Sequence, residues 1–403
     1  MGKKLSKLEK AHNYIIKHYP DTKFNIVSEN VDFGIEGVTI ADVYTELKFA
    51  KIDIPMRDLE TYFRSNRTTK YDPFKDYFKA LKYDRKTDYI GFLSQHIITD
   101  NSNFFESMFK KHLIRTVGQA LGDGKFVNRY VLVFKSSKEH LGKSTFIRFL
   151  EPFGGDYYTE DLGNNPALAF SKNFIYNIEE LETFNKYDIN KLKALISSST
   201  TTDRMMYTQT FIKRIRRCSI FASTNEDAFL GGGENSRWII FNVDSINFDY
   251  NNTKNKKNKI NIDDVWAQAY HLYKSGADYD LTAKEWELTK STNKDYVYKN
   301  DVDLYIDEFL MPSEYAFATA TQISEYLKLK SGRKPFAANI IGKAMVDAKY
   351  KKVSQGTAHG YNVATMKNEG IEGKCNEMKR NYYKNKMGIS DENIEKNDKN
   401  DVF

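Results

Sequence analysis

Apolar residues recur with the spacing of a helix through the N-terminal part of the chain. This pattern predicts helices over residues 7–18, 40–47, 59–63, 89–98 and 104–121. Gly122 and Gly124 then give a turn signal. We therefore expect a mainly helical N-terminal domain over residues 1–70, followed by a helical lead-in over residues 71–124.

After this turn the pattern changes to short, continuous apolar runs. They cover residues 130–134, 174–178, 219–222 and 238–243. Continuous apolar strands are typical of a sheet that helices cover on both faces, because every side chain of such a strand is then buried. Residues 125–290 are predicted to form this α/β core, which helices at 263–275 and 283–290 complete.

A second small domain is predicted over residues 301–366. Helical spacing at 319–327 and 335–348 precedes a hairpin pattern at 350–363 with glycine in its turn. Helix, turn, helix and hairpin is the order of a winged helix-turn-helix. The polar, basic stretch 251–259 is expected to be a loop, and residues 367–403 are charged, poor in apolar residues and expected to be disordered.

The composition is that of a chain with packed cores, since 40% of the 403 residues are hydrophobic and 14% are aromatic. No apolar run approaches the ~18 residues of a membrane span, and the N-terminus lacks the apolar region of a signal peptide. We expect a cytoplasmic protein with no membrane partner. Cys218 and Cys375 are too few for a disulfide framework or a zinc site. The net charge of +7 is modest, so the placement of the cations matters more than their number.

The strand predicted at 130–134 leads into Gly142-Lys143-Ser144-Thr145 and then into an apolar, helix-like run. Strand, tight loop and helix start together aim backbone N–H groups at one point, where Lys143 adds a positive charge and the Ser144 hydroxyl can hold Mg²⁺. This arrangement indicates a phosphate-binding loop for a nucleoside triphosphate, with ATP and Mg²⁺ as the expected ligands. The predicted loop residues are Ser137, His140, Leu141, Gly142, Lys143, Ser144 and Thr145.

Polar residues flank the other predicted strands. Glu179 and Glu180 end the strand at 174–178, where a carboxylate can serve Mg²⁺ and orient the attacking water, although paired glutamates are also common at solvated helix starts. Asn225 can hydrogen-bond the γ-phosphate or the water, or it can simply form a turn. Arg237, just before the strand at 238–243, can reach a nucleotide held by a neighbouring subunit.

Six segments, taken in order, resemble the superfamily 3 helicase core, and most closely the virulence-associated E family of phages and mobile genetic elements. They are Gly142-Lys-Ser-Thr145, Glu179-Glu-Leu181, Leu192-Lys-Ala-Leu-Ile-Ser197, Asp203-Arg204, Ser223-Thr-Asn225 and Ser236-Arg-Trp238. Residues 71–84 resemble the lead-in of that family. The resemblance spans residues 70 to 290, and its order and spacing are more specific than any single motif.

The resemblance implies a AAA+ ATPase that assembles into a ring, usually a hexamer, and translocates along DNA. On that template Lys143 and Ser144 bind the phosphates and Mg²⁺, and Glu179 and Glu180 form the Walker B pair, of which Glu179 contacts the metal. Asn225 is then the sensor and Arg237 the arginine finger. The sequence departs from the usual pattern at Ser137, His140 and Asn177, which bears on the rate of hydrolysis more than on nucleotide binding.

Cations alternate with aromatic residues over residues 202–217, as the binding of single-stranded DNA requires. Superfamily 3 rings resemble one another in a hairpin at this place that projects into the pore. Arg204 and Lys213 are the predicted contacts to single-stranded DNA. The alternative for Arg214, Arg216 and Arg217 is that they make structural ion pairs at the start of a strand.

Lys343, Lys351 and Lys352 lie on or after the second predicted helix of the C-terminal domain. We expect them to contact the phosphates of double-stranded DNA, although a winged helix can also dock a protein.

These observations favour an ATP-dependent DNA helicase or replication initiator of a phage or genomic island. The first 120 residues hold no primase-like cluster of paired carboxylates and histidine, so priming is expected from a separate primase. One alternative is an ATP-switched DNA-binding regulator without unwinding activity. A third possibility is an ATPase of a phage-defence or packaging system.

Overall fold

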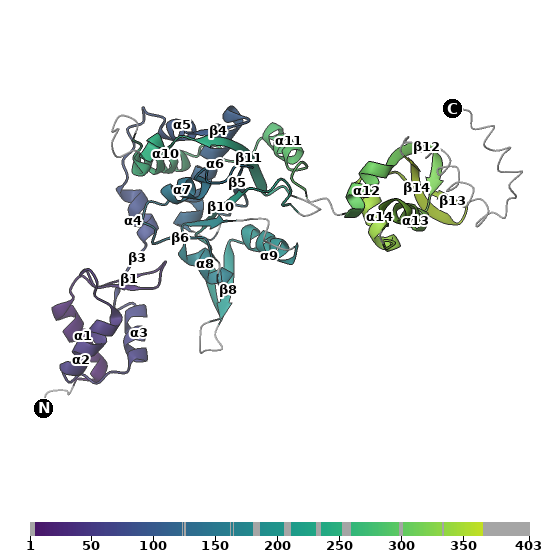
Figure 1. Cartoon of the computed structure of the whole chain (residues 1–403). Coiled ribbons are helices and arrows are strands. Elements are labelled where there is room, and N and C mark those ends of the chain that lie inside the picture. The colour runs from purple at the N-terminus through teal and green to yellow at the C-terminus, as the bar shows by residue number, and fades with distance from the viewer. Residues whose placement is uncertain are drawn as a thin grey trace, which may run out of the picture. The chain divides into compact units, whose positions relative to one another are not determined.

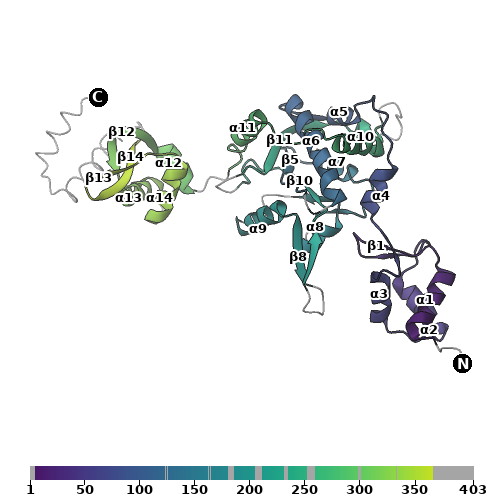
Figure 2. The same ribbon diagram turned by 180° about the vertical axis from the view of Figure 1, so that it is seen from behind.

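The computed structural model describes residues 5–122, 124, 126–161, 163, 165–179, 186–204, 211–230, 235–251, 259–297, 301–332 and 334–365. The chain divides into two compact units, Met1–Val297 and Tyr298–Phe403, and many of their elements are labelled in Figures 1 and 2. Both combine helices with sheets, so the predicted α/β class is confirmed. Among the described residues, no helix is long and apolar enough to cross a membrane.

The N-terminal part of the first unit is a small, mainly helical region. Its elements are α1 (Lys7–His18), β1 (Lys23–Asn25), β2 (Val31–Asp32), α2 (Ile40–Phe49), α3 (Met56–Arg64) and β3 (Thr69–Tyr71). Ser6 and Thr39 begin α1 and α2 as capping boxes, in which the hydroxyl accepts from a backbone N–H and a carboxylate of the first turn accepts from the cap. The apolar faces of the three helices meet in a core of their own.

The lead-in differs from the prediction in one element. It consists of α4 (Pro73–Ala80), α5 (Tyr89–Ser94), β4 (Ile97–Thr99) and α6 (Ser102–Leu121). We predicted one helix over 89–98, but α5 ends at Ser94 and the chain continues as a strand. Ile97 and Thr99 are buried while Ile98 is exposed, an alternation with the period of a strand, and this strand pairs with the edge of the central sheet.

The central sheet has the order β4-β11-β5-β10-β7-β6. Its strands are β4, β5 (Val131–Lys135), β6 (Tyr158–Thr159), β7 (Ile175–Ile178), β10 (Ser219–Thr224) and β11 (Trp238–Ile246). All neighbours in the sheet are parallel except β4, which runs antiparallel to β11. The four predicted strands are therefore β5, β7, β10 and β11.

Alternate side chains of these strands enter two cores, one on each face of the sheet. Leu132 and Phe134 of β5 pack with residues of α6, α7 (Lys143–Phe149) and α10 (Ile262–Lys274). Val131 and Val133 pack with residues of α8 (Pro166–Lys172) and α9 (Lys186–Ser197). Both faces are thus covered, which explains why the strands are apolar at every position.

A two-stranded hairpin, β8 (Thr200–Arg204) and β9 (Phe211–Ile215), follows α9 and extends away from the central sheet in both views (Figures 1 and 2). After β11 come the short 3₁₀ helix η2 (Phe248–Asn251), α10 and α11 (Ala283–Thr292).

The second unit contains the predicted helices and hairpin, together with a helix and a strand that we did not predict. Its elements are α12 (Asp301–Phe309), β12 (Leu310–Ala318), α13 (Ala320–Ser331), α14 (Ala338–Asp347), β13 (Lys352–Gln355) and β14 (Ala358–Thr365), with the sheet order β12-β14-β13. Thr319 begins α13 as a capping box with Gln322. Residues 252–258 of the predicted loop and the predicted disordered tail, residues 367–403, lie outside the described residues.

Candidate functional site

The carboxyl ends of three parallel strands meet at one edge of the central sheet and carry most of the predicted site. The residues that follow β5, β7 and β10 line one cavity of about 400 Å³. These residues are His140, Leu141, Gly142, Lys143, Ser144, Thr145, Glu179, Ser223, Thr224 and Asn225. This edge is where open α/β sheets bind their ligands, because the loops after parallel strands converge there.

Lys143 is the first residue of α7 and is buried, with only 8% of its surface exposed. Its ammonium group donates a hydrogen bond to the Asn225 side-chain oxygen, from the end of the neighbouring strand β10. A buried ammonium needs such an acceptor, since burying a charge without a partner is costly. The predicted lysine and the predicted sensor are therefore in direct contact.

The loop before Lys143 turns through two left-handed backbone positions. Gly142 has φ +77° and His140 has φ +58°. At Gly142 a side chain is excluded twice, by this φ angle and because an added Cβ would lie only 2.2 Å from Cζ of Phe248. At His140, where such loops commonly carry glycine, the same conformation is held by a residue whose side chain points into solvent. Ser137 is exposed and is not among the residues that line the cavity.

Glu179 lies at the end of β7, exposed to the cavity. The hydrogen bond that the Arg148 guanidinium of α7 donates to Glu160 is the main cause that raises its pKa, and the charge of Glu179 makes a smaller contribution. Glu180 lies outside the described residues. Within the part of the chain that is described, no three histidine, cysteine, aspartate or glutamate side chains gather as metal ligands. The Ser144 hydroxyl and the Glu179 carboxylate still suit Mg²⁺, which commonly takes one or two protein ligands beside substrate phosphates.

Two features near the cavity were not predicted. Lys135, the last residue of β5, forms an ion pair with Asp227, which follows β10. This pair links the two strand ends between which Lys143 and Asn225 meet. Phe248 of η2 lies against Gly142 and is 45% exposed. The sequence around Phe248 carries no motif, so only its place in the fold connects it with the loop.

Arg237 does not reach this cavity. Arg237 immediately precedes β11, and Trp238 of β11 pairs in register with Val131 at the start of β5. Arg237 therefore lies at the amino ends of the parallel strands, whereas the phosphate loop lies at their carboxyl ends. Five residues of strand separate the two edges, roughly 16 Å. The Arg237 Nε donates to the Ser197 hydroxyl at the end of α9, at 3.0 Å.

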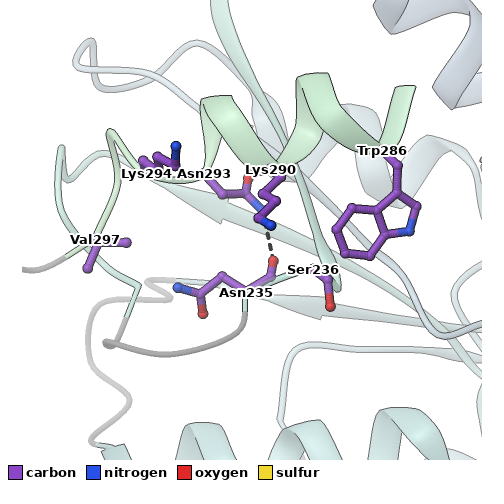
Figure 3. A pocket seen from close by; sticks show the side chains of 7 residues that line it. All are labelled: Asn235, Ser236, Trp286, Lys290, Asn293, Lys294 and Val297. Atoms are coloured by element: carbon purple, nitrogen blue, oxygen red, sulfur yellow. Dashed lines mark hydrogen bonds between the residues drawn. The ribbon is translucent and has the colours of Figure 1, made fainter. Parts of the chain in front are cut away.

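A second cavity, of about 320 Å³, lies between α11 and the residues before β11 (Figure 3). Asn235, Ser236, Trp286, Lys290, Asn293, Lys294 and Val297 line it. Asn293 fixes this wall, since its side-chain amide donates to the carbonyl groups of Asn235 and Trp238 at 2.7 and 2.8 Å. The cavity lies at the sheet edge of Arg237 and shares no residue with the first cavity.

The predicted contacts to single-stranded DNA belong to the β8–β9 hairpin. Lys213 is exposed on β9 and is paired with Thr202. Arg204 is the last residue of β8, and its side chain lies outside the described ones.

The alternative prediction for the three arginines beside Lys213, that they make structural ion pairs, is confirmed for Arg214 and Arg217 and is wrong for Arg216. Arg214 pairs with Glu29 of the N-terminal region, and Arg217 pairs with the buried Asp72 at 2.9 Å. Arg216 is fully buried and donates to the carbonyl groups of Cys218, Ile196 and Asn128 rather than to a carboxylate. Burial lowers the pKa of its guanidinium to about 10.

In the second unit, Lys343 lies on α14, Lys351 precedes β13 and Lys352 begins it. All three side chains are exposed. These three cations thus lie on the third helix of the unit and at the start of its hairpin.

Solved structures with partial similarity include two described as the apo structure and the A form apo structure of the NrS-1 C terminal region (305-718). The first is 11% identical, covers 88% of this chain and 100% of that chain, and has a TM-score of 0.47. The second is 10% identical with the same coverage and a TM-score of 0.45. None of the curated proteins matches the chain. The family described as virulence-associated protein E-like domain matches residues 78–298, more than half of the chain, so this protein belongs to the virulence-associated protein E-like family.

Proposed function

We propose that this protein is an ATP-dependent DNA helicase or replication initiator of a phage or genomic island. The observation that carries the proposal is the cavity in which the phosphate loop, Glu179 and Asn225 meet at the carboxyl edge of a parallel sheet. Three strands far apart in the sequence supply a cation, a carboxylate and an amide to one point. That set is what the hydrolysis of a phosphoric anhydride requires.

In the proposed mechanism Lys143 exchanges one partner for another. Without nucleotide its ammonium group is held by Asn225. When ATP binds, the ammonium group turns to the phosphate oxygens, and the Asn225 amide becomes available to the γ-phosphate or to the attacking water. Ser144 and Glu179 would hold Mg²⁺, which when bound neutralises charge on the phosphates. Glu180 is assigned the orientation of the water, as its place in the sequence suggests.

The position of Arg237 supports assembly into a ring, which we propose to be a hexamer of the AAA+ type. An arginine at the edge of the sheet opposite to its own phosphate loop can complete a nucleotide site only on a neighbouring copy. Such head-to-tail contacts close into rings when the rotation between subunits permits.

Two surfaces are proposed to contact DNA. The β8–β9 hairpin, with Arg204 and Lys213, would contact a single strand in the pore. The second unit, which has the element order of a winged helix, would bind duplex DNA through Lys343, Lys351 and Lys352. Priming would come from a separate primase.

The first test is ATP hydrolysis with and without DNA. A Lys143→Ala protein should lose at least about 100-fold in kcat, because the buried cation acts on charge that develops in the transition state. Lys138→Ala is the matched control, since Lys138 is exposed in the same loop and does not line the cavity. Unchanged hydrolysis in Lys143→Ala would exclude the assignment. Strand displacement on a forked substrate then separates a helicase from an ATP-switched regulator, which would bind ATP and assemble without displacing a strand.

A further inference from the structure

Phe248 occupies an unusual position beside the phosphate loop. Its ring lies against Gly142, so that a Cβ on Gly142 would come within 2.2 Å of it, yet 45% of its surface is exposed. An exposed phenyl ring held against a loop that is proposed to bind phosphate gains little from burial, and it offers an apolar face to solvent.

The fold explains how Phe248 reaches the loop. The first five residues of β11 pair with β5, and β11 then continues past the end of β5, supported on its other side by β4. The chain therefore reaches the level of the loop that follows β5, and η2 places Phe248 there. Tyr250, two residues on, is fully buried and packs on Phe146 and Phe149 of α7, with ring centroids 5.5 and 4.7 Å apart. This contact anchors η2 to the helix that carries Lys143.

The site also has a direction. Asn225 and Glu179 mark its γ-phosphate end in the proposed function, and they follow β10 and β7, on one side of β5. Phe248 follows β11, on the other side of β5. Three strand spacings separate β7 from β11, roughly 14 Å, a distance that an extended nucleoside triphosphate can span. A nucleotide with its γ-phosphate at Glu179 and Asn225 therefore directs its base toward Phe248.

We propose that Phe248 forms a wall of the base-binding end of the nucleotide site and stacks on the base of the bound nucleoside triphosphate. The inference rests on the proposed function and adds a binding residue to it. Stacking uses the π-face that every base has, so Phe248 supports affinity without choosing strongly among bases.

The test compares ligands with and without a base. Calorimetric titration of the full chain would use a non-hydrolysable ATP analogue, the matching GTP analogue and inorganic tripolyphosphate, each with Mg²⁺. Phe248→Ala should lower the affinity for both nucleotides about 5- to 150-fold, the effect of losing the stacking of one base. The affinity for tripolyphosphate should change by less than about twofold. Phe248→Trp keeps an aromatic face and should retain nucleotide affinity. Phe49→Ala removes a ring that is 83% exposed on α2 and is the matched control, with no expected change.

The possible failures are distinguishable. An equal loss for nucleotides and tripolyphosphate in Phe248→Ala would mean that the ring only shapes the loop, and no loss for either would mean that the base lies elsewhere. Both results overturn this inference and leave the proposed function standing. A wild-type chain that binds none of the three ligands would overturn both. Thermal unfolding of each variant shows whether it is folded.

Discussion

His140 holds a left-handed backbone conformation within the phosphate loop, although it carries a side chain. This conformation costs an L-residue about 1–2 kcal/mol, whereas glycine adopts it readily. The His140 side chain points into solvent, so nothing in its packing offsets that cost. The departure at His140 thus changes the stability of the loop rather than its path.

His140→Gly is therefore expected to raise the free energy of unfolding by about 1 kcal/mol, because the strain is relieved. The greater conformational entropy of glycine in the unfolded chain offsets part of this gain. Urea unfolding of the two proteins measures the difference. Ser137→Gly is the control, because Ser137 is exposed without a positive φ angle and gains nothing from glycine. A His140→Gly protein that is less stable than wild type would contradict the claim that the backbone at His140 is strained.

His112 is a buried histidine of α6 that the proposed mechanism does not use. Its ring packs edge-on against Phe221, with centroids 4.6 Å apart. Burial, with smaller contributions from Arg115 and Arg216, lowers the pKa of His112 to about 3. The unfolded chain, where the pKa is ordinary at about 6.5, binds a proton that the folded chain does not.

Stability should therefore be complete above pH 6.5 and fall as the pH drops toward 3, by up to about 1.4 kcal/mol per pH unit from this group. His112→Leu removes the proton linkage and should make the free energy of unfolding less dependent on pH. Urea midpoints at pH 7 and pH 5 for both proteins give the comparison. Equal pH dependence in wild type and variant would show that His112 is not the group responsible.

At the scale of elements, ion pairs and hydrogen bonds hold the base of the β8–β9 hairpin in place, while Lys213 is exposed. Arg214 is tied to Glu29, Arg217 to Asp72, and Arg216 to three backbone carbonyl groups. These contacts position the hairpin, and the exposed Lys213 ammonium group can contact a ligand. In this run of basic residues the three arginines thus have structural contacts, whereas Lys213 faces solvent.

Lys213→Ala is expected to weaken the binding of single-stranded DNA by about the same factor for all sequences. It should also reduce the slope of log K against log salt by about 0.7, the effect of one lost phosphate contact. Fluorescence anisotropy at several salt concentrations measures both quantities. Lys274→Ala, an exposed lysine on α10, is the control. A salt slope that Lys213→Ala leaves unchanged would remove Lys213 from the interface.

Elements with a strong period were predictable from the sequence, and those that depend on a partner were not. The helix over residues 7–18 and the four buried strands are confirmed because their apolar spacing is decided locally. The strand β4 was missed, since three residues form a strand only where β11 offers its edge. The same holds for the candidate site: Lys143 was predicted from the Gly-Lys-Ser-Thr motif and Asn225 from a strand end. The contact of Phe248 with Gly142 and the pair Lys135–Asp227 have no local signal in the sequence.

For the whole molecule, the distance between Arg237 and the phosphate loop of the same chain leads to a specific prediction about how subunits share an active site. If Arg237 acts on a neighbouring copy, each active site is shared between two subunits. Two inactive proteins that lack different halves of this site should then restore each other.

We expect Lys143→Ala and Arg237→Ala each to lose ATP hydrolysis, and an equal mixture to regain up to about a quarter of the wild-type rate, since one random interface in four unites the intact halves. Steady-state hydrolysis of mixtures at several ratios is the measurement. Arg129→Ala, an exposed arginine just before β5 at the same sheet edge, should stay active. A mixture no more active than its components, or a protein that stays monomeric with ATP and DNA, would argue against the shared site.

The sequence by itself determined the α/β class, most helices and strands, and the order of chemical groups along the chain, because periodicity and strand-end residues are local properties. Only the tertiary structure decided which of these groups meet. The strand order brings Lys143, Glu179 and Asn225 to one edge of the sheet and leaves Arg237 at the other. The length of β11 beyond β5 brings Phe248 to the loop. Such distances follow from the pairing of strands far apart in the sequence, which the local pattern does not contain.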